Sequence, residues 1–167
     1  MGNLTPQDFY SVFRVDFNAG RLFWSCPPKN HAEKVGREAG YINIGKGKNK
    51  TYWQVRAFGK TFKRARIIFF MAHGRWPTPC VDHINGDSLD DKLANLRECT
   101  YAQNTVSSRN KFRPNGLPRG VYPTKQGRYM ARITVNGKTR SLGVFDTPTA
   151  AARIYRNKLE EVYGKFA

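Results

Sequence analysis

The sequence predicts an α+β fold built from small antiparallel sheets and short helices. Three observations carry this prediction. Residues 79–110 show the order strand, loop, strand, helix, and residues 119–167 show three strands followed by a helix. Residues 1–78 mix short strand patterns with helical ones, and residues 111–118 hold two prolines and a glycine, typical of a linker. We therefore expect a mixed α/β N-terminal support, a central strand–strand–helix unit, a linker, and a C-terminal three-stranded antiparallel sheet packed on one helix.

In residues 1–78, helices are expected where capping or stop residues border an apolar pattern. Thr5 and Pro6 are typical of a helix start, so the first helix is expected to run to about Phe13. Residues 63–73 place apolar residues on one face at helical spacing, and Gly74 stops this second helix. Strands are expected at 20–24 and 41–44 and, as a hairpin, within 51–62. The three tryptophans of the segment are interpreted as core residues: Trp24, Trp53 and Trp76.

The elements of residues 79–110 follow one another closely. A short strand at 79–84 leads into the turn signal Asn85-Gly86. A polar loop at 87–94 and a second strand at 95–99 follow. Thr100 and Gln103 form a capping box, which predicts a helix from Tyr101 to about Asn110.

In residues 119–167, strands are expected at 119–124, 128–136 and 138–145. Asn136 and Gly137 form the preferred two-residue turn between the last two strands. Thr147 is a helix N-cap, and Pro148 occupies the first helical position. The apolar face that follows predicts a helix as far as Gly164.

The composition argues against a membrane protein and for a reducing compartment. Of 167 residues, 40% are hydrophobic, and the longest apolar run, 67–72, is far shorter than the roughly 18 residues of a membrane span. Polar residues and Pro6 interrupt the start of the chain, so no signal peptide is expected. Three widely spaced cysteines argue against a disulfide scaffold. We expect a cytoplasmic protein.

The charge is strongly positive and unevenly distributed. The chain has 29 Lys and Arg against 12 Asp and Glu, and its net charge of +17 favours nucleic acid as the partner over an anionic membrane surface. Residues 1–78 carry +10 and residues 111–167 carry +9, whereas residues 79–110 carry −2. Carboxylates near a phosphate make sense when a cation lies between them, and a solvated acidic turn is the alternative. The lysines of Lys46–Lys50 are interpreted as phosphate contacts, with a solvated loop as the alternative.

Three side chains of the acidic segment have the chemistry of a phosphodiester-cleaving site. The neutral imidazole of His83 is a general base suited to physiological pH. The carboxylate of Asp82 is a hard oxygen ligand for Mg²⁺, and Asn104, in the first turns of the predicted helix, offers an amide oxygen to the same ion. Adjacent strand residues point to opposite faces, but at the end of a short strand both Asp82 and His83 are expected to reach one cleft.

The segment VDHINGDSLDDKLANLRECTYAQN, residues 81–104, resembles an HNH endonuclease of the His-Asn-Asn kind found in phage and homing enzymes. The resemblance implies the ββα-metal fold, with His83 as the general base beside the metal ligand Asp82. It implies that Asn95 hydrogen-bonds across the loop and fixes its shape, and that Asn104 completes the metal site. The spacings of 12 and then 9 residues fit the family pattern. Related nucleases have a second His where Asn104 stands, so an imidazole-rich metal site is not expected.

The resemblance implies metal-assisted hydrolysis of DNA. His83 takes a proton from the attacking water, and one divalent ion, Mg²⁺ or Mn²⁺, held by Asp82 and Asn104, stabilises the charge that develops on the phosphate. One base and one ion give one active site per chain, so a monomer or weak dimer is expected to nick double-stranded DNA. No protein or membrane partner is implied. The expected enzyme is a homing-type or phage nicking endonuclease of a bacterial or phage-infected cell.

The C-terminal segment has a resemblance of its own. RGVY at 119–122, RYMARI at 128–133 and LGVFDTPTAAARIY at 142–155 resemble the ethylene-response-factor (APETALA-type) DNA-binding domain. In that family a three-stranded sheet lies in the major groove and a helix packs behind it. The resemblance implies that Arg119, Arg132 and Arg140 read guanine edges. The other implied DNA-binding residues are Lys125, Arg128, Lys138 and Met130, which stands where the family usually has Trp.

Other interpretations of the same residues have less support. Cys80, His83 and Cys99 have the chemistry of a zinc site that lacks a fourth ligand, and a zinc-stabilised RNA-binding protein is the corresponding function. A calcium loop of the EF-hand kind does not fit, because alignment on Gly86 leaves Lys92 at the glutamate position. A DNA-binding regulator that does not cleave, with the strand–strand–helix unit as a scaffold, is the main functional alternative.

Overall fold

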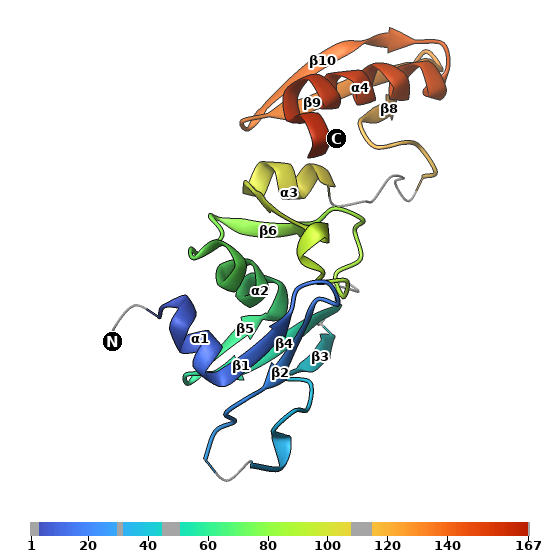
Figure 1. The fold of residues 1–167 in the computed structure, drawn as a ribbon. Coiled ribbons are helices and arrows are strands. Elements are labelled where there is room, and N and C mark those ends of the chain that lie inside the picture. Colours follow the sequence, from blue (N-terminus) through green and yellow to red (C-terminus); the bar gives the residue numbers. More distant parts are fainter. Residues whose placement is uncertain (1–3, 30–31, 45–50, 108–114, 167) are drawn as a thin grey trace. The chain divides into compact units, whose positions relative to one another are not determined.

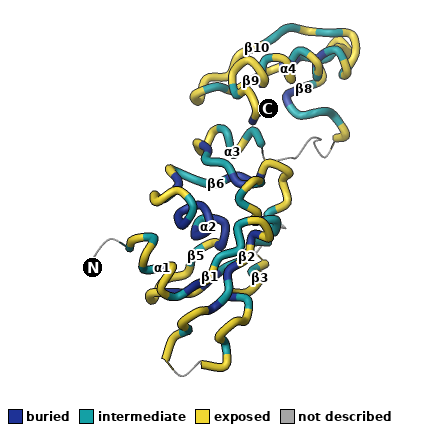
Figure 2. Tube along the Cα trace, viewed as in Figure 1, coloured by how far each residue is buried: buried dark blue, intermediate teal, exposed yellow. Residues whose placement is uncertain are grey.

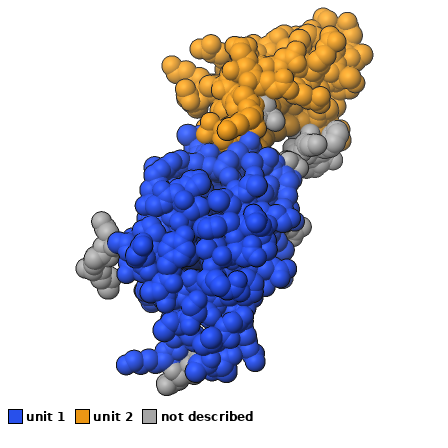
Figure 3. Space-filling view, in the orientation of Figure 1, with its two compact units in different colours: residues 1–100 blue, residues 101–167 orange. Residues whose placement is uncertain are grey.

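The computed structural model describes residues 4–29, 32–44, 51–107 and 115–166. Small antiparallel sheets and helices make up these residues, which confirms the predicted α+β class (Figure 1). The chain divides into two compact units, residues 1–100 and 101–167, referred to below as the N-terminal unit and the C-terminal unit (Figure 3). The finer division into support, central unit, linker and C-terminal domain stays a prediction.

The N-terminal unit begins with a capped helix and a short hairpin. Helix α1 (Pro6–Val12) starts at Thr5, whose side chain accepts a hydrogen bond from the Asp8 amide. The helix ends at Phe13, its C-cap, as the sequence predicts, and Phe13 also opens strand β1 (Phe13–Asp16), which pairs with β2 (Arg21–Trp24). The Phe13 ring packs 4.7 Å from that of Trp24, centroid to centroid. This packing places Phe13 in the core of the unit.

A second sheet has the order β3–β4–β5. It consists of β3 (Tyr41–Ile44), β4 (Thr51–Ala57) and β5 (Lys60–Lys63), all antiparallel. The predicted hairpin is confirmed, and its turn places Phe58 and Gly59 at φ of 51° and 70°. A short 3₁₀ turn (Ala32–Lys34) precedes β3. The lysines of Lys46–Lys50 lie outside the described residues.

Helix α2 (Arg64–His73) forms the centre of this unit (Figure 2). It ends at Gly74, which has φ of 72°, as the sequence predicts. The helix is buried on more than the one predicted face, because α1, β2, β4, β5 and β6 all pack against it. Its buried apolar residues are Ala65, Ile67, Ile68, Phe69, Phe70 and Met71. The three tryptophans lie in or against this core, which confirms their interpretation.

A last hairpin completes the N-terminal unit. Strand β6 (Cys80–His83) pairs with β7 (Leu96–Cys99), and the 3₁₀ turn Leu93–Asn95 precedes β7. Asn95, predicted as the first residue of the second strand, belongs to this turn instead. The loop between the two strands carries Asp87, Asp90 and Asp91, three of the five acidic residues of 79–110.

The C-terminal unit begins with helix α3 (Tyr101–Ser107); the predicted helix end near Asn110 lies outside the described residues. Strands β8 (Val121–Pro123), β9 (Tyr129–Val135) and β10 (Lys138–Phe145) form an antiparallel sheet of order β10–β9–β8. Helix α4 (Pro148–Tyr163) packs on this sheet and is followed by a 3₁₀ turn (Gly164–Phe166). The predicted sheet packed on one helix is therefore confirmed.

Two local features of the C-terminal unit determine the turn between β9 and β10 and the start of α4. Asn136 and Gly137 form the predicted two-residue turn, with φ of 50° and 75°. The Thr147 hydroxyl caps α4 by accepting a hydrogen bond from the Ala150 amide at 3.2 Å. The core of the unit consists of Val121, Ala131, Ile133, Ala151, Tyr155 and Leu159.

Within the described ranges, the structure contains no helix that is both long and apolar enough to cross a membrane.

Candidate active site

The β6–β7 hairpin presents Asp82 and His83 at the end of its first strand. The register pairs Asp82 with Arg97 and His83 with Leu96, without a bulge. Successive strand residues point to opposite faces, so Asp82 and His83 leave the strand in different directions. Asp82 and His83 accordingly have different hydrogen-bond partners. These hydrogen bonds do not bring the two side chains together in one cleft, contrary to the expectation from the sequence.

The carboxylate of Asp82 is paired with the guanidinium of the residue opposite it. Its Oδ2 accepts hydrogen bonds from Arg97 Nε at 2.9 Å and from Arg97 Nη2 at 2.8 Å. The carboxylate is nearly buried, and so is most of its partner. Such a pair compensates for burial of the negative charge. A cation bound at Asp82 would share the carboxylate with Arg97.

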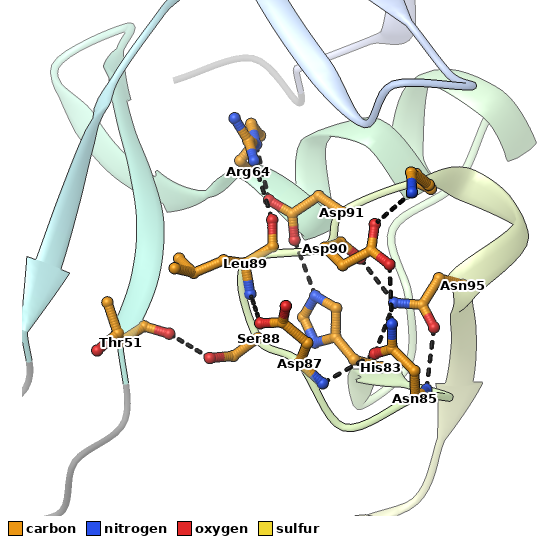
Figure 4. A network of polar contacts seen from close by, with 11 residues as sticks. Thr51, Arg64, His83, Asn85, Asp87, Ser88, Leu89, Asp90, Asp91 and Asn95 are labelled. Carbon is orange, nitrogen blue, oxygen red and sulfur yellow. Dashed lines mark hydrogen bonds and ion pairs between the residues drawn. The ribbon is translucent and has the colours of Figure 1, made fainter.

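His83 belongs to a buried chain of charged groups (Figure 4). Its Nε2 lies 2.8 Å from Asp91 Oδ1, and Asp91 Oδ2 accepts a hydrogen bond from Arg64 Nε at 2.7 Å. Arg64 also donates from Nη1 to Glu38 at 2.7 Å and from Nη2 to the Leu89 carbonyl at 3.3 Å. His83 is 8% exposed, Arg64 4% and Asp91 2%. The imidazole is therefore held from one side by a carboxylate that is itself held by a guanidinium.

The other imidazole nitrogen of His83, Nδ1, is in contact with solvent. Among the described residues Nδ1 has no hydrogen-bond partner. In the same part of the chain, no buried side-chain nitrogen or oxygen lacks a partner. Nδ1 therefore retains contact with solvent, although the ring as a whole is buried. A nitrogen in this position is able to accept a proton from a water molecule.

Asn95 braces the loop between β6 and β7. Its Oδ1 accepts from the Asn85 amide at 3.0 Å, and its Nδ2 donates to Asn85 Oδ1 at 3.1 Å and to the Asp90 carbonyl at 2.7 Å. Asn85 Nδ2 in turn donates to Asp90 Oδ2 at 2.8 Å. These bonds give the loop one shape, and the same loop supplies Asp91 to His83 (Figure 4). The catalytic part of the role expected for Asn95 stays a prediction.

Cys80 and Cys99 face each other at the far end of the hairpin. Their Sγ atoms lie 3.2 Å apart, and both thiols are free. Burial, followed by the hydrogen bond to Cys80, raises the pKa of Cys99 to about 12. Over the described ranges, no three His, Cys, Asp or Glu side chains are arranged to hold a metal ion. The zinc interpretation therefore has no support from the geometry.

Glu98 makes an exposed ion pair on β7. Arg75 donates to both of its carboxylate oxygens at 2.7 and 2.6 Å, and the Thr78 amide donates to Oε1 at 2.6 Å. The hydrogen bonds from Arg75 and from the Thr78 amide lower the pKa of Glu98 to about 2. This pair ties the hairpin to the segment that follows α2.

The chemistry of the available donors fits a hard divalent cation. Mg²⁺ and Mn²⁺ use one or two carboxylates, several waters and substrate phosphate oxygens, so a single carboxylate such as Asp82 satisfies the protein's share of the ligands. Asn104, the second expected ligand, lies on α3 in the C-terminal unit and is half-buried. Its role as a ligand stays a prediction.

A cavity of about 360 Å³ opens beside Arg64 and Glu38. Neither Asp82 nor His83 lines this cavity. Because a DNA duplex contacts a surface and does not enter a pocket, the absence of His83 from the lining does not weigh against a nuclease site.

The DNA-binding residues expected in the C-terminal unit lie on more than one face of its sheet. Arg132 pairs with Ser141 across β9 and β10, whereas Arg140 pairs with Ile133. Directly opposite residues point to the same face, so Arg132 and Arg140 lie on opposite faces of the sheet. The face that carries Arg132 is referred to below as the open face; it also includes Tyr122, Met130, Thr134, Thr139 and Val144.

Two of the expected arginines have partners within the C-terminal unit. Arg119 Nη1 donates to the carbonyls of Thr105 and Val106 at 3.1 and 3.0 Å, in the last turn of α3, where helix carbonyls lack internal partners. Arg128 Nε donates to Asp146 at 2.7 Å in an exposed pair. Lys125, Lys138 and Arg140 are exposed, and Arg132 lies 5.5 Å from the Tyr122 ring centroid. Their contacts with DNA stay predictions.

Sequence reasoning missed three residues that contact the site. Asp91 is one of several acidic residues in the loop, and nothing in its local pattern distinguishes it from Asp87 or Asp90. Arg64 begins a predicted core helix, where a buried cation is not expected. Arg97 carries a detectable signal, because a basic residue facing an acidic one across a hairpin predicts an ion pair once the register is known.

Comparisons with known proteins point to one family. Residues 63–106 match the sequence model of the HNH endonuclease family, and the matched range includes Asp82, His83, Asn95 and Asn104. An uncharacterized HNH endonuclease of Acanthamoeba polyphaga mimivirus is 32% identical over 113 residues, which cover 65% of this chain and 57% of that protein. The chain thus spans little more than half the length of this relative.

Protein 3.8 of Escherichia phage T7 is 29% identical over 120 residues, which cover 71% of this chain and 96% of that protein. No solved structure is significantly similar to the chain. These comparisons support the HNH part of the resemblance and give no support to the ethylene-response-factor part. Residues 63–106, which include the β6–β7 hairpin and its histidine, are thus similar to the HNH endonuclease family.

Proposed function

We propose that the protein is a divalent-metal-dependent endonuclease that hydrolyses phosphodiester bonds in double-stranded DNA. The observation that carries the proposal is the state of His83. Its imidazole is held at Nε2 by Asp91, and its Nδ1 is open to solvent, within a segment that matches the HNH endonuclease family. The net charge of +17 supports a polyanionic substrate.

His83 acts as the general base in this proposal. Nδ1 takes a proton from a water molecule, which then attacks phosphorus in line with the leaving 3′ oxygen. An in-line displacement places the attacking and leaving oxygens on opposite sides of phosphorus.

Asp82 and Asn104 are the proposed ligands of the cation, Mg²⁺ or Mn²⁺. When bound, such an ion supplies Lewis-acid stabilisation of the charge on the scissile phosphate and its leaving oxygen. The proposal for Asn104 rests on the family match of the segment that contains it. Asn95 keeps the loop in the shape that presents Asp91 to His83.

The C-terminal unit is proposed to bind DNA in the manner of an ethylene-response-factor domain. Arg132 is the proposed base contact, because it is exposed on the open face of the sheet, beside Tyr122. Lys125 and Lys138 are proposed phosphate contacts. Arg140, which the resemblance implies to read a guanine edge, is proposed instead as a phosphate contact, because it lies on the face of the sheet opposite to Arg132. Arg119, Arg128 and Met130 are the remaining contacts that the resemblance implies, and Arg119 and Arg128 would exchange their present partners for DNA.

One base and one ion per chain favour single-strand nicking by a monomer or weak dimer, as in a homing-type or phage nicking enzyme. The phage and mimivirus relatives support a phage-infected or virus-infected cell as the setting, where the protein would act in the cytoplasm.

A second candidate function is DNA binding without cleavage. The pairing of Asp82 with Arg97 favours it, because a carboxylate neutralised by a guanidinium binds a cation less strongly. An Arg97→Met variant separates the two functions. It is expected to raise the apparent affinity for Mg²⁺ in a nuclease and to leave a non-cleaving protein inactive.

The test is incubation of the purified protein with supercoiled plasmid and a series of Mg²⁺ and Mn²⁺ concentrations, with EDTA as the control. We expect open-circular product that depends on the metal, and strand mapping is expected to locate one break per binding event. Retention of the supercoiled form with every divalent ion, despite measurable DNA binding, would overturn the proposed nuclease and support the non-cleaving regulator.

A further inference from the structure

Asp91 is a fully buried carboxylate that serves two groups at once. One oxygen lies 2.8 Å from His83 Nε2 and the other accepts from Arg64 Nε at 2.7 Å. Replacing a buried ion pair with apolar residues is often neutral or stabilising, so stability alone is a weak reason for burying three titratable groups together. The arrangement needs an explanation in the chemistry of His83.

We infer that Asp91, held by Arg64, is a positioning residue that sets which nitrogen of His83 carries the proton. The inference rests on the proposed function and names residues to which neither the sequence pattern nor the family match assigns a role. It assigns the proton of the neutral imidazole to Nε2 and leaves Nδ1 as the acceptor.

The donor and acceptor inventory of the three groups carries the inference. Arg64 has only donors, so the Asp91 oxygen that faces it must accept. Arg64 is always charged, and the carboxylate it holds has acceptor sites only. Nε2 of His83 must therefore donate to Asp91, and in the neutral ring the second nitrogen then has no proton. That second nitrogen is Nδ1, the atom in contact with solvent.

Arg64 is itself fixed from several sides. It lies at the start of the buried helix α2, with its guanidinium carbon 4.4 Å from the Trp53 ring centroid. Its other nitrogens bind Glu38 and the Leu89 carbonyl, so rotation would break three hydrogen bonds. The donor that faces Asp91 therefore stays in place when Asp91 is substituted.

The backbone of Asp91 is fixed by a close approach of another loop. Gly20 has φ of 68°, and a Cβ atom there would lie 2.3 Å from the carbonyl carbon of Asp91. The Leu93 amide donates to the Phe17 carbonyl at 3.0 Å, two residues further along. The carboxylate is thus held at both its backbone and its side chain, as orientation of a histidine requires.

These constraints predict an unusual effect for Asp91→Asn. Arg64 Nε still demands an acceptor, so the oxygen of the new side-chain amide faces Arg64 and its NH₂ group faces His83. Nε2 must then accept, and the proton moves to Nδ1. The variant keeps the shape of the site but leaves the solvent-facing nitrogen unable to take a proton.

The test measures the tautomer and the reaction separately, on the full-length protein. Long-range ¹⁵N–¹H correlation spectra of the neutral imidazole, assigned with His83→Ala, are expected to show Nε2–H in the wild type and Nδ1–H in Asp91→Asn. Single-turnover nicking of plasmid is expected to fall roughly 10²–10⁴-fold in Asp91→Asn, as when a catalytic histidine is held in the wrong tautomer. DNA affinity is expected to stay unchanged. Asp87→Asn, which changes an exposed carboxylate in the same loop, is the matched control and is expected to behave as wild type.

Arg64→Lys distinguishes positioning from mere support of the fold. The lysine keeps a positive charge and leaves Asp91 an acceptor, so we expect the Nε2–H tautomer to survive while the melting temperature falls. A purely structural role predicts that the two variants lose nicking in proportion to lost stability, and this result would overturn the inference. An Nδ1–H tautomer in the wild type, or wild-type nicking by Asp91→Asn, would overturn it too. If the wild type shows Nε2–H but nicks no DNA, the proposed function fails and the inferred tautomer stands without a catalytic use.

Discussion

The two hairpins β6–β7 and β9–β10 treat charge in opposite ways. In β6–β7 the charged groups of the candidate site are buried and have fixed partners, as the pairs Asp82–Arg97 and His83–Asp91 show. In β9–β10 the charged groups are exposed, and a two-residue turn at Asn136 replaces the long braced loop. Two antiparallel hairpins thus differ in whether their charged side chains are buried and paired or exposed to solvent.

The difference follows from what each hairpin is proposed to do. A proton transfer requires atoms held at hydrogen-bond distance, and burial with defined partners supplies this precision. Attraction to phosphates acts over the Debye length of roughly 8–10 Å and tolerates mobile side chains. We therefore interpret the buried, paired charges of β6–β7 as groups for proton transfer, and the exposed charges of β9–β10 as groups that bind DNA.

Among the substitutions that test this contrast between the two hairpins, Asn95→Ala is expected to have the largest effect. It removes the side-chain bonds to Asn85 and Asp90, at a cost of about 1–3 kcal/mol in the free energy of unfolding. Nicking is expected to fall as well, because the loop that carries Asp91 loses its brace. Chemical denaturation and plasmid nicking measure the two effects.

The matched control for the braced loop lies in the other hairpin. Asn136→Gly replaces a turn residue at φ of 50°, a conformation that glycine adopts readily, so stability and nicking should change little. Equal loss of stability in both variants would contradict the contrast between the braced loop and the simple turn.

Arg132→Ala and Arg140→Ala sharpen the comparison at the exposed hairpin. If Arg132 reads a base from the open face, its loss costs about 1–3 kcal/mol in binding and relaxes sequence preference. If Arg140 contacts a phosphate, its loss weakens binding uniformly and lowers the salt dependence by about one contact. Fluorescence anisotropy over a range of salt concentrations, with specific and random duplexes, measures both; identical profiles for the two variants would count against separate roles.

Glu98 provides a smaller effect within the catalytic hairpin. Its pKa is lowered to about 2 by hydrogen bonds from Arg75 and Thr78, from 4.5 without them. A carboxylate with a lowered pKa contributes stability above the unfolded value and loses it as the pH falls toward the folded one. The melting temperature should therefore fall between pH 4.5 and about 2, and fall less steeply in Glu98→Gln. Parallel curves for the two proteins would rule out this contribution.

The smallest expected effect is a difference in reactivity between the cysteine thiols. Burial raises the pKa of Cys99 to about 12, so its reactive thiolate is scarce at neutral pH. Cys26 is exposed and should react first with a disulfide reagent, while Cys99 should react only on unfolding. The rates with native and denatured protein, measured with single Cys→Ser variants, decide between this order and simultaneous reaction.

Much of the fold could be predicted because local signals agreed with the packing. The Thr5 and Thr147 caps, the Gly74 stop and the Asn136-Gly137 turn are all found where the sequence places them. Strand β1 could not be predicted, because its pairing with β2 and the contact of Phe13 with Trp24 form only in the folded chain.

The site could be predicted only in part, for a physical reason. The spacing of His83, Asn95 and Asn104 is visible in one dimension. The partners of His83 come from a loop aspartate and from the first residue of α2, and only the folded chain brings them together. The separation of Arg132 from Arg140, by contrast, follows from the two-residue turn, which fixes the register, and was accessible from sequence.

Plasmid nicking by His83→Ala tests the central claim most directly. With Mg²⁺ and supercoiled plasmid, this variant is expected to nick roughly 10²–10⁴-fold more slowly than wild type while binding DNA equally well. His73→Ala, which removes an exposed imidazole at the end of α2, is the matched control and is expected to nick at the wild-type rate. Nicking by His83→Ala at the wild-type rate would contradict the assignment of the open imidazole nitrogen as the base.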